Sequence, residues 1–314
     1  MNILVTGANG QLGRCLQDVV NVSGNGKPDH FVGEPNYYIF KSHDELDITD
    51  QDLVSEFVRD NHICVIVNFA AYTNVNKAQE DRDKAYDVNA MGPMYLALAA
   101  KEVGAVLIHI STDYVHGGFH NTPIPNTDPG KDFFKTVERE GCYYGYSKCM
   151  GEELILSSGF KNYIILRTSW LCSEYGKNFV KTMYERAING QESSVVFDQV
   201  GCITDARDLA LFVYQLIEEN SSKTPLLSQF GTYNFTGAGV CSWYDVAYYV
   251  YGLSCDSANI NVTKKFTPED EPVKRPNYSV LDTSKTEEVF SYRPKHWMKS
   301  IDNIIKRIQN GKRV

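Results

Sequence analysis

Short apolar runs alternate with longer amphipathic segments along the first 110 residues. The amphipathic pattern predicts helices that include residues 50–60 and 93–103. Parallel strands joined by crossover helices produce such an alternation, because helices then cover both faces of the sheet. We therefore expect an α/β fold with a Rossmann-type, doubly wound parallel sheet. The predicted strands cover residues 2–6, 37–40, 63–68, 105–110 and 163–167.

After about residue 172 the alternation loosens, and helix-like runs are mixed with short strands and a Pro-rich stretch at 268–276. The helix-like runs cover residues 176–189, 205–219 and 242–252. Such a change predicts a smaller second lobe packed on the first domain. The expected division is a dinucleotide-binding domain at 1–172, to which 196–228 return, and a smaller C-terminal substrate-binding lobe made of 173–195 and 229–314.

Capping residues and breakers predict where some elements begin and end. Thr49 is the expected N-cap of the helix at 50–60, because its hydroxyl can accept a hydrogen bond from a first-turn amide. Pro93 suits the first turn of the next helix, where no N–H is needed. Gly- and Pro-rich loops are expected at 21–36 and 117–141, the second beside the mouth of the site.

Composition limits the classes of partner. The 314 residues carry 31 Lys and Arg against 39 Asp and Glu, a net charge of −8 that disfavours nucleic acid. The cysteines show no Cys-x-x-Cys pair and no zinc-finger spacing, so we expect reduced thiols in the cytoplasm. The amino terminus has no signal-peptide pattern, and no apolar run is long enough to cross a bilayer. We therefore expect a small-molecule ligand and no membrane partner.

A glycine-rich turn follows the first predicted strand and opens an amphipathic segment. In the run Gly7-Ala8-Asn9-Gly10-Gln11-Leu12-Gly13, the glycines allow a tight turn that leaves helix-terminal amides facing a pyrophosphate. The alternative is a turn that only joins a strand to a helix. No Walker lysine follows, so the turn favours a dinucleotide over phosphoryl transfer.

The end of the second predicted strand bears on the choice of dinucleotide. An NAD-preferring site often has an acidic residue there, whereas this chain has Lys41 and Ser42. We therefore expect NADPH, with NADH as the alternative, since Asp44 and Glu45 follow closely. A solvated surface lysine is the other interpretation of Lys41.

Tyr144 and Lys148 stand four residues apart in CYYGYSKCMGEE, a segment predicted to be a helix that begins near Tyr143. This spacing places both side chains on one helix face. A phenol titrates near pH 10, and a nearby ammonium together with cofactor charge would lower its pKa enough for proton exchange. Because the chain has 20 tyrosines, a chance match is the alternative for this pair alone.

Hydroxyl groups follow the predicted strand at 105–110. Ser111, Thr112, Asp113 and Tyr114 come at its carboxyl end, where open α/β sheets bind their ligands. A hydroxyl there can donate to a carbonyl oxygen, although Ser and Thr alone could serve only to satisfy backbone groups in a turn. The combination with the glycine turn and the Tyr and Lys pair indicates proton chemistry beside a dinucleotide.

In its glycine turn, its Ser and Thr hydroxyls and its Tyr and Lys pair, the chain resembles the extended short-chain dehydrogenase/reductase superfamily and, within it, the dTDP-4-dehydrorhamnose reductases. The resemblance covers nearly the whole sequence. In related nucleotide-sugar dehydratases an Asp-Glu pair follows the threonine, whereas here Asp113 is followed by Tyr114. The segments that carry the resemblance are NFAAYTNVNKAQED at 68–81, STDYV at 111–115, RTSW at 167–170, DQVGCITDARDLA at 198–210 and RPNYSVLDTSK at 275–285.

The resemblance implies an oxidoreductase that transfers hydride from NAD(P)H to C4 of dTDP-4-dehydro-6-deoxy-L-mannose. The product would be dTDP-L-rhamnose, formed in the last step of its biosynthesis. By the family pattern Tyr144 protonates the C4 oxygen, Lys148 holds the nicotinamide ribose and lowers the tyrosine pKa, and Thr112 donates to the same oxygen. The alternatives are another nucleotide-sugar 4-ketoreductase or epimerase, and a non-catalytic dinucleotide-binding regulatory subunit.

Further site residues follow from the same resemblance. Asp47 has an alternative as an N-terminal helix charge, and Trp170 as core packing. The implied substrate-binding residues are Thr112, Asp113, Tyr114, Trp170 and, for the pyrophosphate, Arg275. The implied cofactor-binding residues are Gly7, Gly10, Gln11, Leu12, Gly13, Lys41, Ser42, Asp47, Ile48, Ala70, Ala71, Tyr72, Thr73, Asn89, Ser111, Tyr144 and Lys148.

The sequence departs from the family pattern in several places. His116 and Gly117 replace the usual Phe-Asp, and Ile203 replaces a proline. Some bacterial members bridge a dimer through Mg²⁺ held by glutamates, one of them near position 15, where this chain has Cys15. We therefore expect no metal there, and the sequence leaves the oligomeric state, including a homodimer, open.

Overall fold

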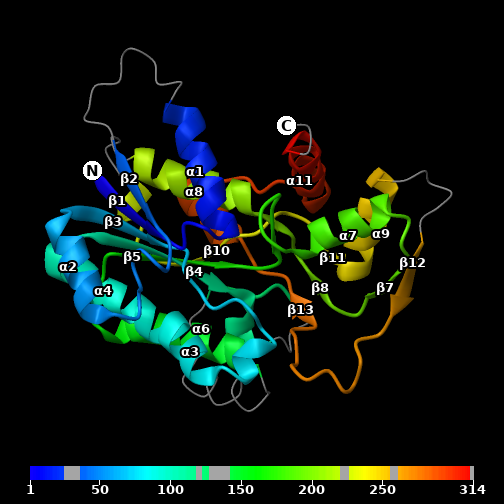
Figure 1. Cartoon of the computed structure of the whole chain (residues 1–314), viewed down its shortest axis with the longest axis horizontal. Coiled ribbons are helices and arrows are strands. Elements are labelled where there is room, and N and C mark those ends of the chain that lie inside the picture. The colour runs from blue at the N-terminus through cyan, green and yellow to red at the C-terminus, as the bar shows by residue number, and fades with distance from the viewer. Residues whose placement is uncertain (25–35, 118–121, 127–141, 220–225, 255–260, 312–314) are drawn as a thin grey trace.

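A six-stranded parallel sheet organises the chain in the computed structural model, which describes residues 1–24, 36–117, 122–126, 142–219, 226–254 and 261–311 (Figure 1). The order of its strands reverses between β1 and β3, so the sheet is doubly wound, as expected. Across the sheet the strands are β10 (Gly231–Asn234), β5 (Tyr163–Thr168), β4 (Val106–Thr112), β3 (Ile63–Asn68), β1 (Asn2–Thr6) and β2 (Tyr37–Lys41).

Helices cover both faces of this sheet, which explains the continuous apolar runs of its strands (Figure 1). In β1, Ile3 and Val5 belong to the hydrophobic cluster on one face, while Leu4 belongs to the cluster on the other. One face is covered by α1 (Gln11–Gly24) and α8 (Ala206–Glu218). The other is covered by α2 (Gln51–Asp60), α4 (Gly92–Val103) and α6 (Tyr143–Ser157). Each fully buried aliphatic side chain contributes about 1.5–3 kcal/mol to folding.

The helix boundaries confirm one capping prediction and correct another. Pro93 lies in the first turn of α4, as expected. The N-cap of α2 is Asp50, not Thr49: the Asp50 carboxylate accepts from Leu53 N at 3.0 Å. Thr49 instead donates its amide and hydroxyl hydrogens to Asp47 Oδ1, at 2.9 and 2.8 Å. A carboxylate one residue later therefore takes the capping position.

Part of the predicted loop at 21–36 is helical, because α1 continues to Gly24; residues 25–35 lie outside the described residues. Most of the loop predicted at 117–141 also lies outside them. Short helical turns connect the longer elements near the site. These are η1 (Lys77–Gln79), α3 (Arg82–Tyr86), the π-helical turn η2 (Asp87–Met91) and η3 (Asp113–His116).

The C-terminal part of the chain has a hydrophobic cluster of its own, formed largely by α7 (Phe179–Ile188), α9 (Trp243–Ser254) and α11 (Trp297–Gly311). Helices α7, α8 and α9 account for the helix-like runs predicted after residue 172, whereas α11 was not predicted. The small strands here are β6 (Leu171–Cys172) paired with β9 (Thr204–Asp205), β7 (Ser193–Val196) paired with β12 (Val262–Lys265), and β8 (Val200–Gly201) between β11 (Cys241–Ser242) and β13 (Tyr278–Ser279).

Two segments assigned from sequence to the C-terminal lobe pack with the first domain. Strand β10 pairs with β5 at the edge of the large sheet. Phe290, at the end of α10 (Ser284–Phe290), joins the cluster formed by α1 and α8. The turn η5 (Leu226–Ser228) precedes β10. The chain thus returns to the first domain twice after α7.

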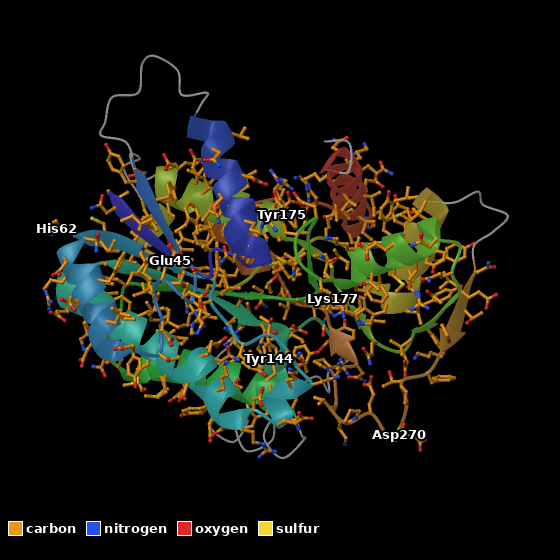
Figure 2. All side chains as sticks on the ribbon, viewed as in Figure 1. Glu45, His62, Tyr144, Tyr175, Lys177 and Asp270 are labelled. Carbon is orange, nitrogen blue, oxygen red and sulfur yellow. The ribbon has the colours of Figure 1, made fainter. Side chains whose placement is uncertain are left out.

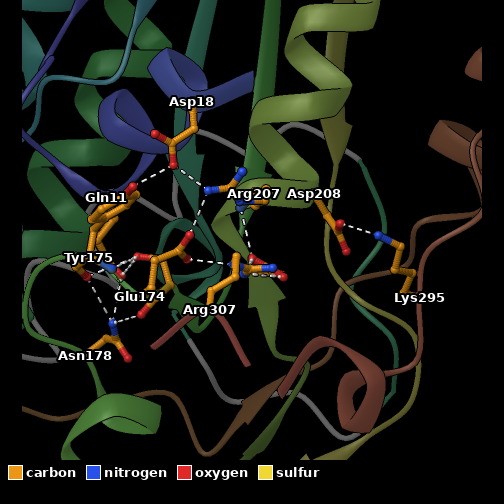
Figure 3. Close-up of polar contacts among 11 residues, drawn as sticks. Gln11, Asp18, Glu174, Tyr175, Asn178, Arg207, Asp208, Lys295 and Arg307 are labelled. Carbon is orange, nitrogen blue, oxygen red and sulfur yellow. Dashed lines mark hydrogen bonds and ion pairs between the residues drawn. The ribbon is translucent and has the colours of Figure 1, made fainter. Parts of the chain in front are cut away.

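An ion-pair cluster fastens the C-terminal part to the first domain (Figure 3). Arg307 of α11 binds Asp205 at 2.7 Å and Glu174 at 2.9 Å. Arg207 of α8 binds Glu174 at 2.8 Å and also pairs with Asp18 of α1. Three helices therefore share one charge network.

Among the described residues, no helix is long and apolar enough to cross a membrane. The seven described cysteines are free thiols.

Candidate active site

The glycine turn lies at the carboxyl end of β1 and requires glycine at two positions. Gly7 has a φ of +69°, and a Cβ there would lie 2.6 Å from Ala70 N. A Cβ at Gly13 would lie 2.4 Å from Gly7 O. The backbone therefore passes close to the segment after β3, and the first amides of α1 are left to face a ligand.

Ser111 and Thr112 end β4, which is separated from β1 by β3, at the same edge of the sheet. The Ser111 hydroxyl is buried, with no hydrogen-bond partner among the described residues. Thr112 accepts from Tyr114 N at 3.3 Å and donates to Asp113 Oδ1 at 3.0 Å. A buried hydroxyl without a partner, beside a glycine turn, fits a site that a polar ligand completes.

Asp113 points into the protein from the start of η3. Its Oδ2 accepts from the Ser279 hydroxyl at 2.5 Å, which ties β4 to β13 of the C-terminal part. Burial raises the pKa of Asp113 to about 6, although hydrogen bonds from Ser279 and Thr112 oppose the shift. Both carboxylate oxygens are thus engaged with protein groups.

Tyr144 comes from the first turn of α6, which begins at Tyr143 as predicted. Figure 2 shows it on the α6 side of the sheet, next to the C-terminal part. Its ring meets the Tyr114 ring edge to face, with centroids 5.3 Å apart. Burial raises the pKa of the Tyr144 phenol, and the side-chain hydrogen bond with Thr112 opposes the rise. The expectation of a lowered pKa is therefore not met in this structure.

Lys148 lies one turn further along α6, and its ammonium nitrogen is directed into the sheet rather than at Tyr144. Nζ donates to Ile110 O at 2.7 Å and lies 3.3 Å from His109 Nε2. Burial lowers the pKa of Lys148 to about 8, with a smaller opposing effect from Glu152. This placement explains why Lys148 does not lower the Tyr144 pKa here.

Asn89 joins the segment after β3 to α6. Its Oδ1 accepts from Tyr72 N at 2.8 Å, and its Nδ2 donates to Tyr72 O and to Ser147 Oγ, each at 3.0 Å. A Cβ at Gly151 would lie 2.1 Å from Asn89 O, so α6 packs closely on η2. These contacts fix residues 70–73 beside the helix that carries Tyr144 and Lys148.

The end of β2 carries polar residues that were assigned to cofactor binding from the sequence. Lys41 Nζ lies 5.3 Å from the centroid of the Phe57 ring. Ser42 donates through its amide and hydroxyl to Glu45 Oε2, at 2.8 and 2.7 Å. Ile48 is buried beside Gly92. The edge therefore presents both a cation and a carboxylate.

A cavity of about 460 Å³ adjoins Tyr114 and extends into the C-terminal part. The Trp170 and Trp243 rings stack in its wall, with centroids 3.6 Å apart and planes at 10°. Arg275, also in the wall, binds Asn76 Oδ1 at 2.8 Å and Glu271 at 3.2 Å. Sequence reasoning found Tyr114, Trp170 and Arg275 but missed Trp243, for which its place at the start of a predicted helix was the only signal.

Three departures from the family pattern have local explanations. His116 Nε2 lies 3.3 Å from Arg167 Nη1, so it can form a hydrogen bond with this buried guanidinium, which a phenylalanine could not. Ile203 is fully buried in the C-terminal cluster. Cys15 is buried in α1. Burial raises the pKa of its thiol, and the negative charge of Glu174 raises it further. Among the described residues no group of three or more His, Cys, Asp or Glu is arranged to hold a metal ion.

Comparisons with known proteins agree on one family. The sequence model described as RmlD substrate binding domain matches residues 1–310. The chain is 36% identical over 308 residues to the dTDP-4-dehydrorhamnose reductase of Aggregatibacter actinomycetemcomitans, covering 96% of this chain and 97% of that protein. It is also 36% identical over 300 residues to the spore coat polysaccharide biosynthesis protein SpsK of Bacillus subtilis, covering 95% of each.

Solved structures give the same result. The dTDP-4-dehydrorhamnose reductase of Clostridium acetobutylicum superposes with a TM-score of 0.83 at 36% identity, covering 98% of this chain and 100% of that one. The Bacillus anthracis reductase, solved in complex with NADP, gives a TM-score of 0.80 at 31% identity, covering 98% and 99%.

Proposed function

The chain belongs to the RmlD substrate binding domain family, and on that premise we propose that it is a dTDP-4-dehydrorhamnose reductase. It would be an NAD(P)H-dependent oxidoreductase that reduces the C4 keto group of dTDP-4-dehydro-6-deoxy-L-mannose to give dTDP-L-rhamnose, the last step of dTDP-rhamnose biosynthesis. The observation that carries this proposal is the contact of Thr112 and Tyr144 beside Tyr114, where the cavity adjoins the sheet edge.

The groups at the sheet edge fit a dinucleotide. A Cβ at Gly7 or Gly13 would collide with neighbouring backbone, so the tight turn needs glycine there, and this turn directs the first amides of α1 toward a pyrophosphate. The Ser111 hydroxyl, which has no hydrogen-bond partner among the described residues, offers a hydrogen bond next to the proposed reacting centre. We assign the cofactor to these groups, to residues 70–73 held by Asn89, and to the end of β2.

NADPH is the proposed cofactor, and NADH the alternative. Lys41 supports NADPH, because a cation near the ribose favours the additional phosphate. The Glu45 carboxylate, bonded to Ser42, is the group that would favour NADH. A cofactor bound here supplies the hydride for the reduction.

Tyr144 is the proposed proton donor to the C4 oxygen. The phenol carries its proton at neutral pH and can therefore donate it, although burial raises its pKa and so makes it a weaker acid. Thr112, whose hydroxyl donates to Asp113 Oδ1 in this structure, would redirect that hydrogen to the C4 oxygen and stabilise the charge that develops there. Lys148, one turn away, is assigned to the nicotinamide ribose and to proton exchange, for which its pKa, lowered to about 8 by burial, is suited.

The cavity beyond Tyr114 is the proposed site of the nucleotide sugar. Trp170 and Trp243 present flat apolar surfaces, and Arg275 presents forked donors that suit a pyrophosphate. Asp113 shapes the junction through its bond to Ser279. Binding in this cavity places the sugar between the two parts of the chain.

The domain division and compartment are also proposed. The separate hydrophobic clusters support a dinucleotide-binding domain at 1–172 with 196–228, to which we add β10 and α10, and a substrate-binding lobe formed by 173–195 and the rest of 229–314. The free thiols among the described cysteines support a cytoplasmic enzyme.

One assay tests the proposed reaction. The purified chain is mixed with NADPH or NADH and with dTDP-4-dehydro-6-deoxy-L-mannose, its D-xylo epimer or UDP-linked keto sugars, and cofactor oxidation is followed by absorbance. We expect oxidation with the L-mannose compound and a lower KM for NADPH than for NADH. Preference for another sugar would indicate a different 4-ketoreductase, and oxidation with none would indicate a binding subunit.

A further inference from the structure

A chain of buried polar side chains crosses the sheet beneath the site and ends at Lys148. It begins at Thr6 in β1 and continues through Asn68 in β3 and His109 in β4. Thr6 is paired with Asn68, and Asn68 with His109, in the strand register. Lys148, the most exposed of the four, is only 2% exposed. Because buried polar groups need partners, the direction of each hydrogen bond here is constrained.

The backbone fixes the orientation of the Asn68 amide. Ala70 N lies 3.1 Å from Asn68 Oδ1, and a main-chain N–H can only donate. The Thr6 hydroxyl donates to the same oxygen at 2.7 Å. A reversed amide would bring two N–H donors together at Ala70. The Nδ2 group must therefore face His109.

This orientation determines the tautomer of His109. Asn68 Nδ2 lies 3.0 Å from His109 Nδ1, so Nδ1 accepts the hydrogen bond. Burial lowers the pKa of His109 well below its usual value, and the nearby Lys148 lowers it further, so the ring is neutral. A neutral imidazole has one N–H, and with Nδ1 as acceptor the proton lies on Nε2.

The Nε2–H of His109 is directed at Lys148 Nζ, which lies 3.3 Å away. An ammonium is a donor only, so two donors would meet, whereas an uncharged amine can accept this hydrogen. The amine still donates to Ile110 O at 2.7 Å. The chain of hydrogen bonds then runs in one direction, with a donor facing an acceptor at each step.

The other titratable groups around Lys148 do not reverse this preference. Glu152, on the same helix face, favours the ammonium, but Arg167 of β5 neutralises it at 2.6 Å within the core. Arg167 in turn contacts His116 of η3. Tyr144, one turn earlier, is an uncharged phenol at neutral pH.

We propose that Asn68 and His109 are positioning residues of this site: Asn68 fixes the Nε2-protonated tautomer of His109, and that N–H stabilises the uncharged amine of Lys148. The consequence for catalysis rests on the proposed function, because it concerns the lysine assigned to proton exchange. A lysine that gains and loses its proton near neutral pH is suited to that task.

The tautomer is measured directly by NMR of the folded chain with ¹⁵N-labelled histidine. A long-range ¹H–¹⁵N spectrum distinguishes a protonated from an unprotonated ring nitrogen, and His109→Gln assigns the signals. We expect His109 to be protonated on Nε2 and unprotonated on Nδ1. A proton on Nδ1 would overturn the proposal. The tautomer is read from the wild-type signals, and the His109→Gln protein serves only to assign them, so it need not be active.

The effect on Lys148 is measured with Asn68→Asp. A carboxylate accepts from Ala70 N as before but also accepts from His109 Nδ1, which moves the proton to Nδ1 and leaves Nε2 to accept from an ammonium. We expect the titration midpoint of Lys148, followed by ¹³C-labelled lysine and assigned with Lys148→Met, to rise by at least about 1 pH unit.

Thr6→Val is the matched control, since it removes a hydroxyl from the same oxygen of Asn68 while Ala70 N still orients the amide. We expect it to leave the His109 tautomer and the Lys148 midpoint unchanged. An Asn68→Asp protein whose His109 proton has moved but whose Lys148 midpoint has not would contradict the proposal. Neither result depends on nucleotide-sugar turnover, so failure of the proposed reaction would be recognised separately.

Discussion

At the scale of single residues, the most demanding feature is a charged pair in the core of the first domain. Arg167 and Glu152 have side chains that are 0% and 3% exposed. The guanidinium donates to the carboxylate at 3.0 Å, 3.2 Å and 2.6 Å. A buried charge costs several kcal/mol unless it is paired and hydrogen-bonded. The pair therefore holds α6 on β5 only while both partners are present.

Glu152→Gln tests this pair. The substitution keeps the size of the side chain but leaves the Arg167 charge uncompensated, so we expect the free energy of unfolding to fall by about 3–5 kcal/mol. The measurement is urea unfolding followed by circular dichroism. Glu153→Gln, at the next position, is the control and should change stability by less than about 0.5 kcal/mol. Equal effects of the two substitutions would contradict this account.

Residue-level predictions from the sequence were best where chemistry and position coincide. Tyr144, Lys148 and Thr112 were found because spacing on a helix and the end of a strand place them at one edge. Trp243 and His109 were missed, because their importance comes from contacts that no local pattern records. The rise in the Tyr144 pKa comes from burial in the packed structure, which no local pattern records, whereas the predicted lowering by an ammonium and cofactor charge stays a prediction.

At the scale of elements, most of the longer helices and strands were predicted and the short ones were not, although the 15-residue helix α11 was missed despite its amphipathic pattern. Five strands of the large sheet were predicted from their apolar runs, which arise because helices cover both faces of the sheet. The sixth, β10, was not predicted. Its four residues carry little periodic signal. The two-residue strands β6, β8, β9, β11 and β13 were also missed, because their pairing is set by tertiary contacts.

The packing of α6 explains how the elements build the site. The close approach of Gly151 to Asn89 O brings α6 against η2, while Lys148 reaches β4. One helix therefore connects the segment after β3 with the strand that ends in Thr112. This arrangement brings residues that are distant in sequence to one edge, and the i,i+4 spacing of Tyr144 and Lys148 alone could not reveal it.

At the scale of the whole molecule, the two parts of the chain must keep a fixed relation, because the proposed cofactor and sugar sites lie on different parts. The ion-pair cluster of Asp18, Glu174, Asp205, Arg207 and Arg307 provides this connection (Figure 3). Its carboxylates Asp205 and Glu174 are 0% and 10% exposed. They depend on the guanidinium of α11 for compensation.

Arg307→Ala tests the connection. Removing this guanidinium leaves two largely buried carboxylates with fewer cations, so we expect the free energy of unfolding to fall by about 2–3 kcal/mol, less than for a fully buried pair because Arg307 is partly exposed. Chemical unfolding measures the loss. Lys306→Ala, on an exposed position of the same helix, serves as the control. Unchanged stability of Arg307→Ala would show that the cluster does not hold the parts together.

The central claim is that the Tyr144 hydroxyl supplies the proton in an NADPH-dependent reduction of a dTDP-linked 4-keto sugar. Its most direct test is the kcat of Tyr144→Phe with NADPH and dTDP-4-dehydro-6-deoxy-L-mannose, measured beside the Kd for NADPH. The control is Tyr143→Phe, a substitution at the preceding position. We predict that kcat of Tyr144→Phe falls at least ~100-fold while the Kd stays near that of the wild type. Full turnover by Tyr144→Phe would contradict the account.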